Sequence, residues 1–322
     1  MALAEPDEIA ERLAGLLGVA RVDGLVRLSG GASRDTWRFT ADGRPLILQT
    51  QRPGDVRDMG IEAGVLRAAE AAGMPVPSLL AASSLATDLG APYLVLTFVA
   101  GETIARKILR DDLFADARSR LTAQLGAALA RLHSIGTDAV PGLVETDQLA
   151  QYRDALDLLG QPHPTFELAL RWLADHRPAA SARSVVHGDF RLGNVIVGAD
   201  GLRAVIDWEL AHIGDPMEDL GWLCVKAWRF GASHPVAGVG HYDELFAAYE
   251  AAGGAPIDPD AVRWWEVLGT LKWGIMCIMQ TNAHLSGASR SHELAAIGRR
   301  VCENEHDLFV ALDGRWAPRE RS

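Results

Sequence analysis

The sequence predicts an α+β protein of two lobes, with a small antiparallel-sheet lobe at residues 1–100 and a larger, mainly helical lobe at residues 101–322. Three observations lead to this prediction. Short apolar runs separated by glycine turns fill the first hundred residues, and apolar residues at helical spacing dominate after residue 102. The length of 322 residues also fits two domains, because a domain has roughly 100–200 residues.

The first lobe begins with an expected amphipathic helix at residues 5–18, where the apolar side chains share one face. Residues 25–50 predict three strands. A glycine-rich turn at Gly30 and Gly31 joins the first two, and Asp42-Gly43 is typical of the hairpin turn before the third.

Two further elements complete this lobe. Residues 59–73 predict a helix that ends at Gly73, because Pro75 and Pro77 follow. Residues 92–102 predict a buried strand that leaves the sheet near Gly101, so we expect the lobes to be joined at 97–102.

The second lobe is expected to be helical around a short group of strands. Its predicted elements are helices at 111–134 and 147–178 (the latter broken by Pro162 and Pro164), a strand pair within 185–197, a strand at 202–209, and helices from 216 onward with loops near 231–240 and 252–259.

Composition excludes several classes of function. The net charge of -11 disfavours nonspecific binding to nucleic acid or to an anionic membrane. The apolar stretch 267–280 contains Lys272 and is too short to span a bilayer. Three cysteines without a CxxC pair and an acidic N-terminus favour a cytoplasmic protein. The oligomeric state stays open.

The segment "VVHGDFRLGNVIV", residues 185–197, places polar residues between two strand-like runs. We expect a hairpin whose turn presents Asp189 and Asn194, and Asp207 ends the next apolar run. Phosphoryl transfer needs an acceptor for a hydroxyl proton and oxygen ligands for a metal ion. Asp189 suits the first task, and Asn194 and Asp207 suit the second, because Mg²⁺ prefers oxygen ligands.

HGDFRLGN followed by IDWE resembles the catalytic core of the aminoglycoside phosphotransferase family, which has a protein-kinase-like fold. The resemblance implies that Asp189 is the catalytic base, with His187 bracing the loop and Arg191 as a further candidate catalytic residue. It implies that Asn194 and Asp207 hold Mg²⁺. The expected activity is transfer of the γ-phosphate of ATP, with GTP not excluded, to a hydroxyl group of a small molecule.

The resemblance also implies a nucleotide site in the first lobe. "LSGGASRDTWRF" corresponds to the phosphate-covering loop, with Gly30, Gly31, Ala32, Ser33 and Arg34 as candidate contacts, although any glycine hairpin has this composition. The strand ending at Thr97, Phe98 and Val99 corresponds to the hinge that binds the nucleobase, or is a plain buried strand. Glu62 corresponds to the helix glutamate that pairs with a lysine, or is a surface carboxylate.

One residue departs from the family pattern. The third strand, "PLILQT", has Gln49 where related kinases have a lysine that holds the phosphates, and no lysine precedes Lys107. The positive charge is supplied by an arginine, with Arg52 and Arg34 as candidates, is left to magnesium, or is missing. Glu62 thereby loses its expected lysine partner, and the alternative to an active enzyme is a catalytically silent nucleotide-binding module.

The acceptor is the least defined part of the prediction. Residues 260–290 carry Trp264, Trp265 and Trp273 but few acids, which disfavours a polycationic acceptor, although aromatic residues at helical spacing are also typical of a core. The pattern is similar to the kinase-like domain associated with acyl-CoA dehydrogenases, which implies an apolar or hydroxyacyl alcohol. The alternative is an aminoglycoside or macrolide phosphotransferase.

Overall fold

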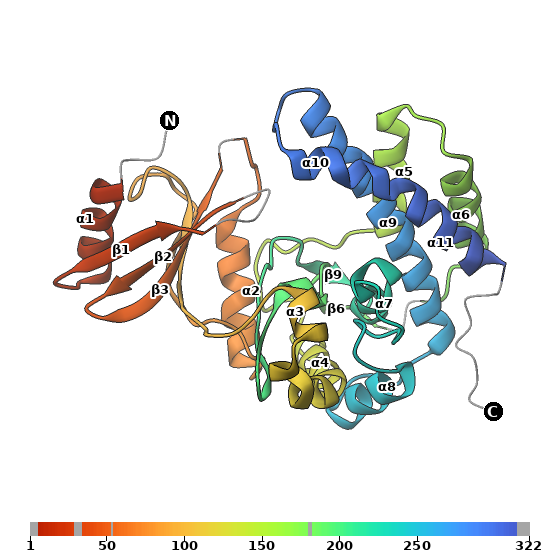
Figure 1. Ribbon diagram of the computed structural model, residues 1–322, viewed down its shortest axis with the longest axis horizontal. Coiled ribbons are helices and arrows are strands. Elements are labelled where there is room, and N and C mark those ends of the chain that lie inside the picture. Colours follow the sequence, from red (N-terminus) through yellow and green to blue (C-terminus); the bar gives the residue numbers. More distant parts are fainter. Residues whose placement is uncertain (1–5, 29–33, 53, 180–181, 314–322) are drawn as a thin grey trace.

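The computed structural model describes residues 6–28, 34–52, 54–179 and 182–313. It confirms the α+β prediction: a five-stranded antiparallel sheet is followed by a mainly helical region (Figure 1). The first part contains α1 (Pro6–Leu17), β1 (Val22–Arg27), β2 (Arg34–Ala41), β3 (Arg44–Gln51), α2 (Met59–Ala71), β4 (Leu79–Ser83) and β5 (Tyr93–Thr97).

The sheet has the strand order β1-β2-β3-β5-β4 and separates two packing layers. In β3, Leu46 and Leu48 are buried in a cluster with Ile9 and Leu13 of α1. Ile47 and Gln49 point to the opposite face because side chains alternate along a strand. There, Ile47 packs with Leu94 and Leu96 of β5 in the main core, and Gln49 is half-buried. Both faces of the sheet are therefore covered by apolar packing, with Gln49 a polar position on the face toward α2.

Helix α2 forms as the sequence predicts. The Asp58 side chain accepts a hydrogen bond of 2.7 Å from the backbone N–H of Gly60 and caps the N-terminus. Beyond the C-terminus, Gly73 has φ +75°, a conformation that favours glycine. The buried face of α2, which includes Glu62, contacts β4 and β5, and of the elements in this part of the chain β4 was not predicted from the sequence.

The second part of the chain is helical around two short strand pairings in its described residues. Its helices are α3 (Ala105–Arg110), α4 (Ala115–His133), α5 (Gln148–Leu159), α6 (Pro164–Asp175), α7 (Met217–Cys224), α8 (Tyr242–Ala251), α9 (Pro259–Leu285), α10 (His292–Ile297) and α11 (Val301–Leu312). Its strands are β6 (Ser184–Val186), β7 (Val195–Gly198), β8 (Gly201–Val205) and β9 (His212–Gly214), and 3₁₀ turns lie at Asp112–Phe114, Leu192–Asn194, Lys226–Arg229 and Gly298–Arg300.

The predicted hairpin at 185–197 is wrong. Strand β6 pairs with β9, whereas β7 pairs with β8. A 3₁₀ turn at Leu192–Asn194 redirects the chain, so the strands before and after it belong to different two-stranded sheets. The polar segment is therefore a loop held between two sheets, and the side chains that anchor it come from elsewhere.

Helix α9 organises the helical region. It begins at the Asp258 cap with Pro259 in its first turn, and it packs against α5, α6, α7, α10 and α11. Lys272 and Glu266 lie buried within it. In the part of the chain that the structure describes, no helix combines the length and apolarity that a membrane span requires.

Helices α7 and α9 approach closely at Gly221. A Cβ atom added there would lie 2.5 Å from the Cβ of Trp265 and 2.8 Å from the backbone nitrogen of Glu266. Only a residue without a side chain fits at this crossing, because backbone atoms on α9 cannot move aside locally.

We therefore expect Gly221→Ala to lower the free energy of unfolding by about 1–3 kcal/mol through overpacking. Gly15→Ala in α1 is the matched control, since nothing lies within 4 Å of its added Cβ. It should raise stability by up to about 1 kcal/mol through helix propensity. Urea unfolding measures both; equal effects of the two substitutions would contradict the close packing.

Candidate active site

The loop from His187 to Asn194 is anchored by a buried carboxylate on α7. Asp219 accepts hydrogen bonds from the backbone N–H of His187 at 2.7 Å and of Gly188 at 2.9 Å. The Nε2 atom of His133 lies 3.2 Å from the same carboxylate. Burial raises the pKa of Asp219, but His133 and the backbone donors lower it by more, and the net shift is downward. Asp219 therefore remains a charged acceptor for the loop.

His187 lies inside the loop and is inaccessible to solvent. Its Nε2 atom lies 3.1 Å from the carbonyl oxygen of Ile206, and its Nδ1 atom accepts a hydrogen bond of 3.2 Å from the backbone N–H of Asp189. Burial is the main cause of a lowered pKa for His187, so its imidazole is neutral. These contacts connect the loop to the segment that carries Asp207.

The Asp189 carboxylate is held by donors from three directions. The side-chain amide of Asn194 donates to Oδ2 at 2.6 Å, and the indole N–H of Trp222 donates to Oδ1 at 2.8 Å. Arg191 donates through Nε to Oδ1 at 3.0 Å. The sequence analysis did not select Trp222, although it ends the segment "GDPMEDLGW" that begins at Gly214.

Asn194 and Asp207 lie at the same end of the β7–β8 hairpin, where the backbone N–H of Ile206 donates to the carbonyl of Asn194 at 2.9 Å. Because the Nδ2 atom of Asn194 faces Asp189, its side-chain oxygen is directed elsewhere. Asp207 has φ +70°, an uncommon conformation for a residue with a side chain. Burial, with Glu209 and Asp189 nearby, raises its pKa to about 7.

This arrangement suits a divalent cation with few protein ligands. The chain offers an amide oxygen and a carboxylate in a region of excess negative charge. Within the described ranges, no group of three or more His, Cys, Asp or Glu side chains gathers in a way that could hold a metal. An amide oxygen and a carboxylate are the kind of ligand that Mg²⁺ prefers, since it keeps several waters or phosphate oxygens.

Glu62 has a partner, and it is Arg34. The two side chains form a buried ion pair between the start of β2 and α2, and each is only 6% exposed. The Nε atom of Arg34 also lies 3.7 Å from Glu209, which pairs with Arg57 at 3.0 Å. Burial raises the pKa of Glu62 despite Arg34. Glu62, which lacks the expected lysine partner, therefore pairs with an arginine from β2.

The register of the sheet explains this pairing. Arg34 lies opposite Gln51, and Thr36 lies opposite Gln49, so Arg34 and Gln49 are on the same face of neighbouring strands. Arg52 is on the other face, where its Nε atom donates to Asp35 at 2.8 Å. Of the two candidate arginines, Arg34 is thus the one beside Glu62.

The remaining candidate nucleotide contacts fall in two places. Gly30, Gly31, Ala32 and Ser33 lie outside the described residues. At the expected hinge, the backbone N–H of Thr97 donates to Ser78 and that of Phe98 donates to Pro45. Within the described chain, the N–H of Val99 has no such backbone hydrogen bond.

The tryptophans of 260–290 belong to the core. Trp264 is 2% exposed and donates its indole N–H to the carbonyl of Leu173 at 2.9 Å, and Trp273 is 8% exposed in a cluster with Trp222 and Trp228. Trp265 is half-buried beside a water-sized cavity. The expectation that aromatic residues at this spacing belong to the core is confirmed, because helical spacing on α9 turns them toward other helices.

Comparisons with known proteins agree with this geometry. The model of the phosphotransferase enzyme family matches residues 24–265. The chain is similar to acyl-CoA dehydrogenase family member 10 of Mus musculus, with 28% identity over 250 residues, which cover 71% of this chain and 23% of the relative. This chain spans about a quarter of the length of this relative and of the acyl-CoA dehydrogenase family member 11 proteins that it also matches.

Two crystal structures show the same fold. A putative aminoglycoside phosphotransferase from Ralstonia eutropha has a TM-score of 0.74 at 20% identity, covering 94% of this chain and 98% of the other. A thermostable mutant of aminoglycoside phosphotransferase APH(4)-Ia, in a ternary complex with AMP-PNP and hygromycin B, has a TM-score of 0.65 at 16% identity, covering 94% and 98%.

We expect Asp219→Asn to destabilise the protein by about 2–4 kcal/mol at pH 7. The uncharged amide cannot replace the carboxylate as the charged acceptor of two backbone N–H groups. Because the pKa of Asp219 is lowered in the folded protein, its contribution to the free energy of unfolding increases with pH. Its contribution is present above the ordinary pKa of 3.8 and is lost as the pH falls through the lower folded-state pKa.

The difference between wild type and Asp219→Asn should therefore shrink below about pH 4. Chemical denaturation from pH 7 to pH 3 measures it. The control is Asp175→Asn, at an exposed position at the end of α6, which should change stability by less than about 0.5 kcal/mol. A difference that grows toward acid would contradict the role of the Asp219 charge.

Proposed function

The chain belongs to the phosphotransferase enzyme family, and from this premise we propose that it transfers the γ-phosphoryl group of ATP to a hydroxyl group of a small molecule. The observation that carries the proposal is the Asp189 carboxylate, held by Asn194 and Trp222 on the loop that also leads to Asp207. This constellation provides a base and cation ligands for phosphoryl transfer.

Asp189 is proposed as the base that receives the proton of the acceptor hydroxyl. Its carboxylate is oriented by fixed donors, so it meets the acceptor without rearranging its own loop. His187 is neutral and enclosed, so it supports the loop and transfers no proton. Arg191 is proposed to balance the charge of Asp189 until the hydroxyl arrives.

Asn194 and Asp207 are proposed to hold Mg²⁺. The directed amide oxygen and the crowded carboxylate fit its preference for oxygen ligands. When bound, the ion supplies positive charge that stabilises the transferred phosphoryl group. The residues themselves orient the phosphates relative to Asp189, and the contact of His187 with Ile206 keeps the two segments in register.

The nucleotide is proposed to lie between lobes at residues 1–100 and 101–322, with Val99 as the donor to the base. Arg34 is proposed to contact the phosphates in place of the absent lysine. It follows directly on the glycine-rich segment, it shares a face with Gln49, and Glu62 orients it. Its Nε and Nη1 atoms are buried and, within the described residues, have no hydrogen-bond acceptor.

The acceptor is proposed to be a hydroxyacyl compound or a related anionic alcohol. The similarity to acyl-CoA dehydrogenase family member 10 supports this class. The guanidinium of Arg191 supports it too, because it is 24% exposed beside Asp189 and would repel a polycationic aminoglycoside. The acceptor class is tested by measuring ADP release with a panel of 3-hydroxy acids, their coenzyme A esters, aminoglycosides and macrolides. Turnover of an antibiotic alone would overturn the proposed acceptor class.

The first test of the activity needs no acceptor. Mg·ATP at about 100 times its dissociation constant should stabilise the folded protein by about 2.7 kcal/mol, a shift of several degrees in Tm. We expect Asp207→Asn, which tolerates a positive φ, to lose the magnesium-dependent part of this shift. Asp189→Asn should keep the shift but lower turnover by about 10²–10⁴-fold. A shift in the wild type that does not depend on magnesium, or no shift at all, would instead support a catalytically silent kinase-like module.

A charge-relocation experiment tests Arg34. Arg34→Gln should weaken Mg·ATP binding about tenfold or more, since a charged hydrogen bond contributes about 1.5–3 kcal/mol. The double variant Arg34→Gln/Gln49→Lys should recover affinity, because residue 49 lies on the same face of the adjacent strand. Arg52→Gln is the control and should change affinity less than about twofold. Isothermal titration measures all three; no loss in Arg34→Gln would exclude the proposed contact.

A further inference from the structure

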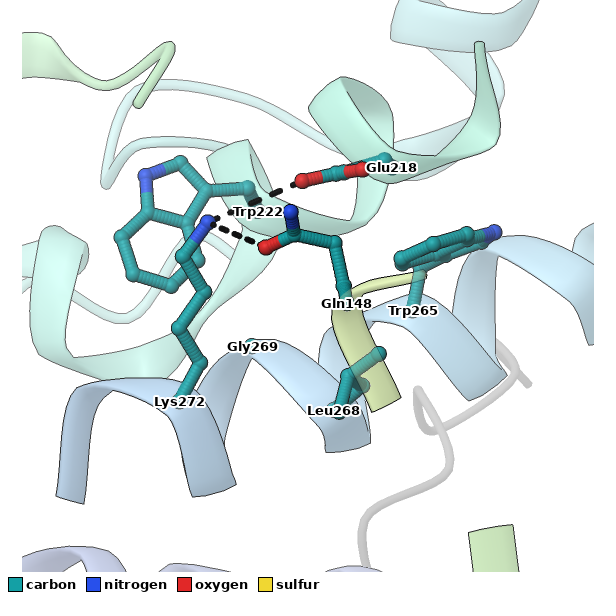
Figure 2. A pocket seen from close by; sticks show the side chains of 7 residues that line it. All are labelled: Gln148, Glu218, Trp222, Trp265, Leu268, Gly269 and Lys272. Atoms are coloured by element: carbon teal, nitrogen blue, oxygen red, sulfur yellow. Dashed lines mark hydrogen bonds and ion pairs between the residues drawn. The ribbon is translucent and has the colours of Figure 1, made fainter. Parts of the chain in front are cut away.

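A buried lysine lies directly behind the loop that carries Asp189. Lys272 of α9 is 4% exposed, and its Nζ atom donates to the carbonyl oxygen of Gly188 at 2.9 Å. It also donates to Oε1 of Gln148 at 3.3 Å and lies 3.6 Å from Glu218, as the dashed lines in Figure 2 show for these two side chains. An enclosed ammonium without such partners would cost several kcal/mol, so these acceptors keep Lys272 charged in the interior.

The same ammonium contacts the residue that holds the base. The Nζ atom lies 4.7 Å from the centroid of the Trp222 ring, and the two side chains lie together in Figure 2. The N–H at the edge of this ring donates to Asp189 at 2.8 Å. A cation over the face of an indole is attracted to the ring. Trp222 is thus fixed by Lys272 at its face and connected to Asp189 at its edge.

Gly188 is restrained on both sides of its backbone. Its N–H donates to Asp219, and its carbonyl accepts from Lys272. Gly188 has φ +76°, and an added Cβ would lie 2.5 Å from the carbonyl oxygen of Leu210, so no other residue fits this turn. The two peptide groups that flank Gly188 are therefore each held in one orientation, the first by the Asp219 carboxylate and the second, immediately before Asp189, by the Lys272 ammonium.

Lys272 has no access to a substrate. The cavity beside it, lined also by Trp265 and Leu268, measures about 10 Å³, which is at the lower limit for one water molecule. Burial lowers the pKa of Lys272, but the acidic groups around it, Tyr152, Glu218 and Asp189, raise it by more. On its far side, Glu218 also contacts His212 at 3.1 Å, so the network is closed within the protein.

We propose that Lys272, through Trp222 and Gly188, is the positioning residue that sets the orientation of the Asp189 carboxylate. This inference rests on the proposed role of Asp189 as the base. A lysine used only for stability would need no contact with the two groups that flank the carboxylate. The specific consequence is that loss of the contact impairs the turnover step and spares nucleotide binding.

The test uses three variants of the full chain. Trp222→Phe keeps an aromatic ring and removes the indole N–H donor. Lys272→Met removes the positive charge and keeps a side chain of similar length. Trp264→Phe is the matched control. Trp264 is equally buried and also loses one indole hydrogen bond, but its partner is Leu173 in a different cluster. Turnover is followed as hydrolysis of Mg·ATP, with water in place of the alcohol.

We expect Trp222→Phe and Lys272→Met to lower kcat about tenfold or more, which is about 1.4 kcal/mol in the activation free energy. The KM for ATP and the ATP-induced Tm shift should stay within about twofold and about one degree of wild type. Trp264→Phe should lose comparable stability and keep its kcat. When added to Asp189→Asn, Trp222→Phe should cause no further loss, because both act on one carboxylate.

A spectroscopic measurement gives an answer without turnover. The indole N–H resonance of Trp222 is identified in a ¹⁵N correlation spectrum as the signal missing from Trp222→Phe. It should move upfield in Asp189→Asn and in Lys272→Met, and stay in place in Trp264→Phe. An unmoved resonance in Lys272→Met, with wild-type kcat, would overturn the inference. If Asp189→Asn keeps full turnover, the proposed function of Asp189 fails instead, and the two failures are distinguishable.

Discussion

The architecture of the site depends on one buried carboxylate. The backbone of the His187–Asn194 loop lies between two separate two-stranded sheets, so strand pairing cannot satisfy its N–H groups. Asp219 accepts from two of them, and a buried backbone donor without a partner would be costly. Asp219 belongs to α7, which crosses α9 at Gly221. The loop is therefore held in place by the packing of the helical core. The position of Asp189 is thereby connected to helix packing that is distant in sequence.

Charge is distributed unevenly across the site. Around Asp189, donors from Asn194, Trp222 and Arg191 compensate the carboxylate. Around Asp207, the neighbouring carboxylates of Glu209 and Asp189 dominate, and its pKa rises to about 7. The protein thus stabilises the charge of the proposed base and leaves the adjacent carboxylate short of positive charge. That contrast fits the proposed Mg²⁺ site, since the cation would bring the missing positive charge.

The ion pair of Arg34 and Glu62 shows how the register of a sheet selects the partner of a buried carboxylate. Side chains at neighbouring cross-strand positions on one face are within reach of the same partner. A long side chain from β2 can therefore meet Glu62 although β3 carries the neutral Gln49. Arg52 cannot, because alternation places it with Asp35 on the face that packs toward α1.

By itself, the sequence determined the order and type of most elements, because helical and strand periodicity are local properties. It also placed Asp189, Asn194 and Asp207 together, because they occur within 19 residues of one another around a short strand pair. Only the tertiary structure decided which strands pair, which arginine meets Glu62, and that the aromatic residues of α9 are core. It alone revealed Trp222 and Lys272 behind Asp189, since their contacts join residues 33 and 84 positions apart. Such contacts depend on how helices cross, and no local pattern encodes that.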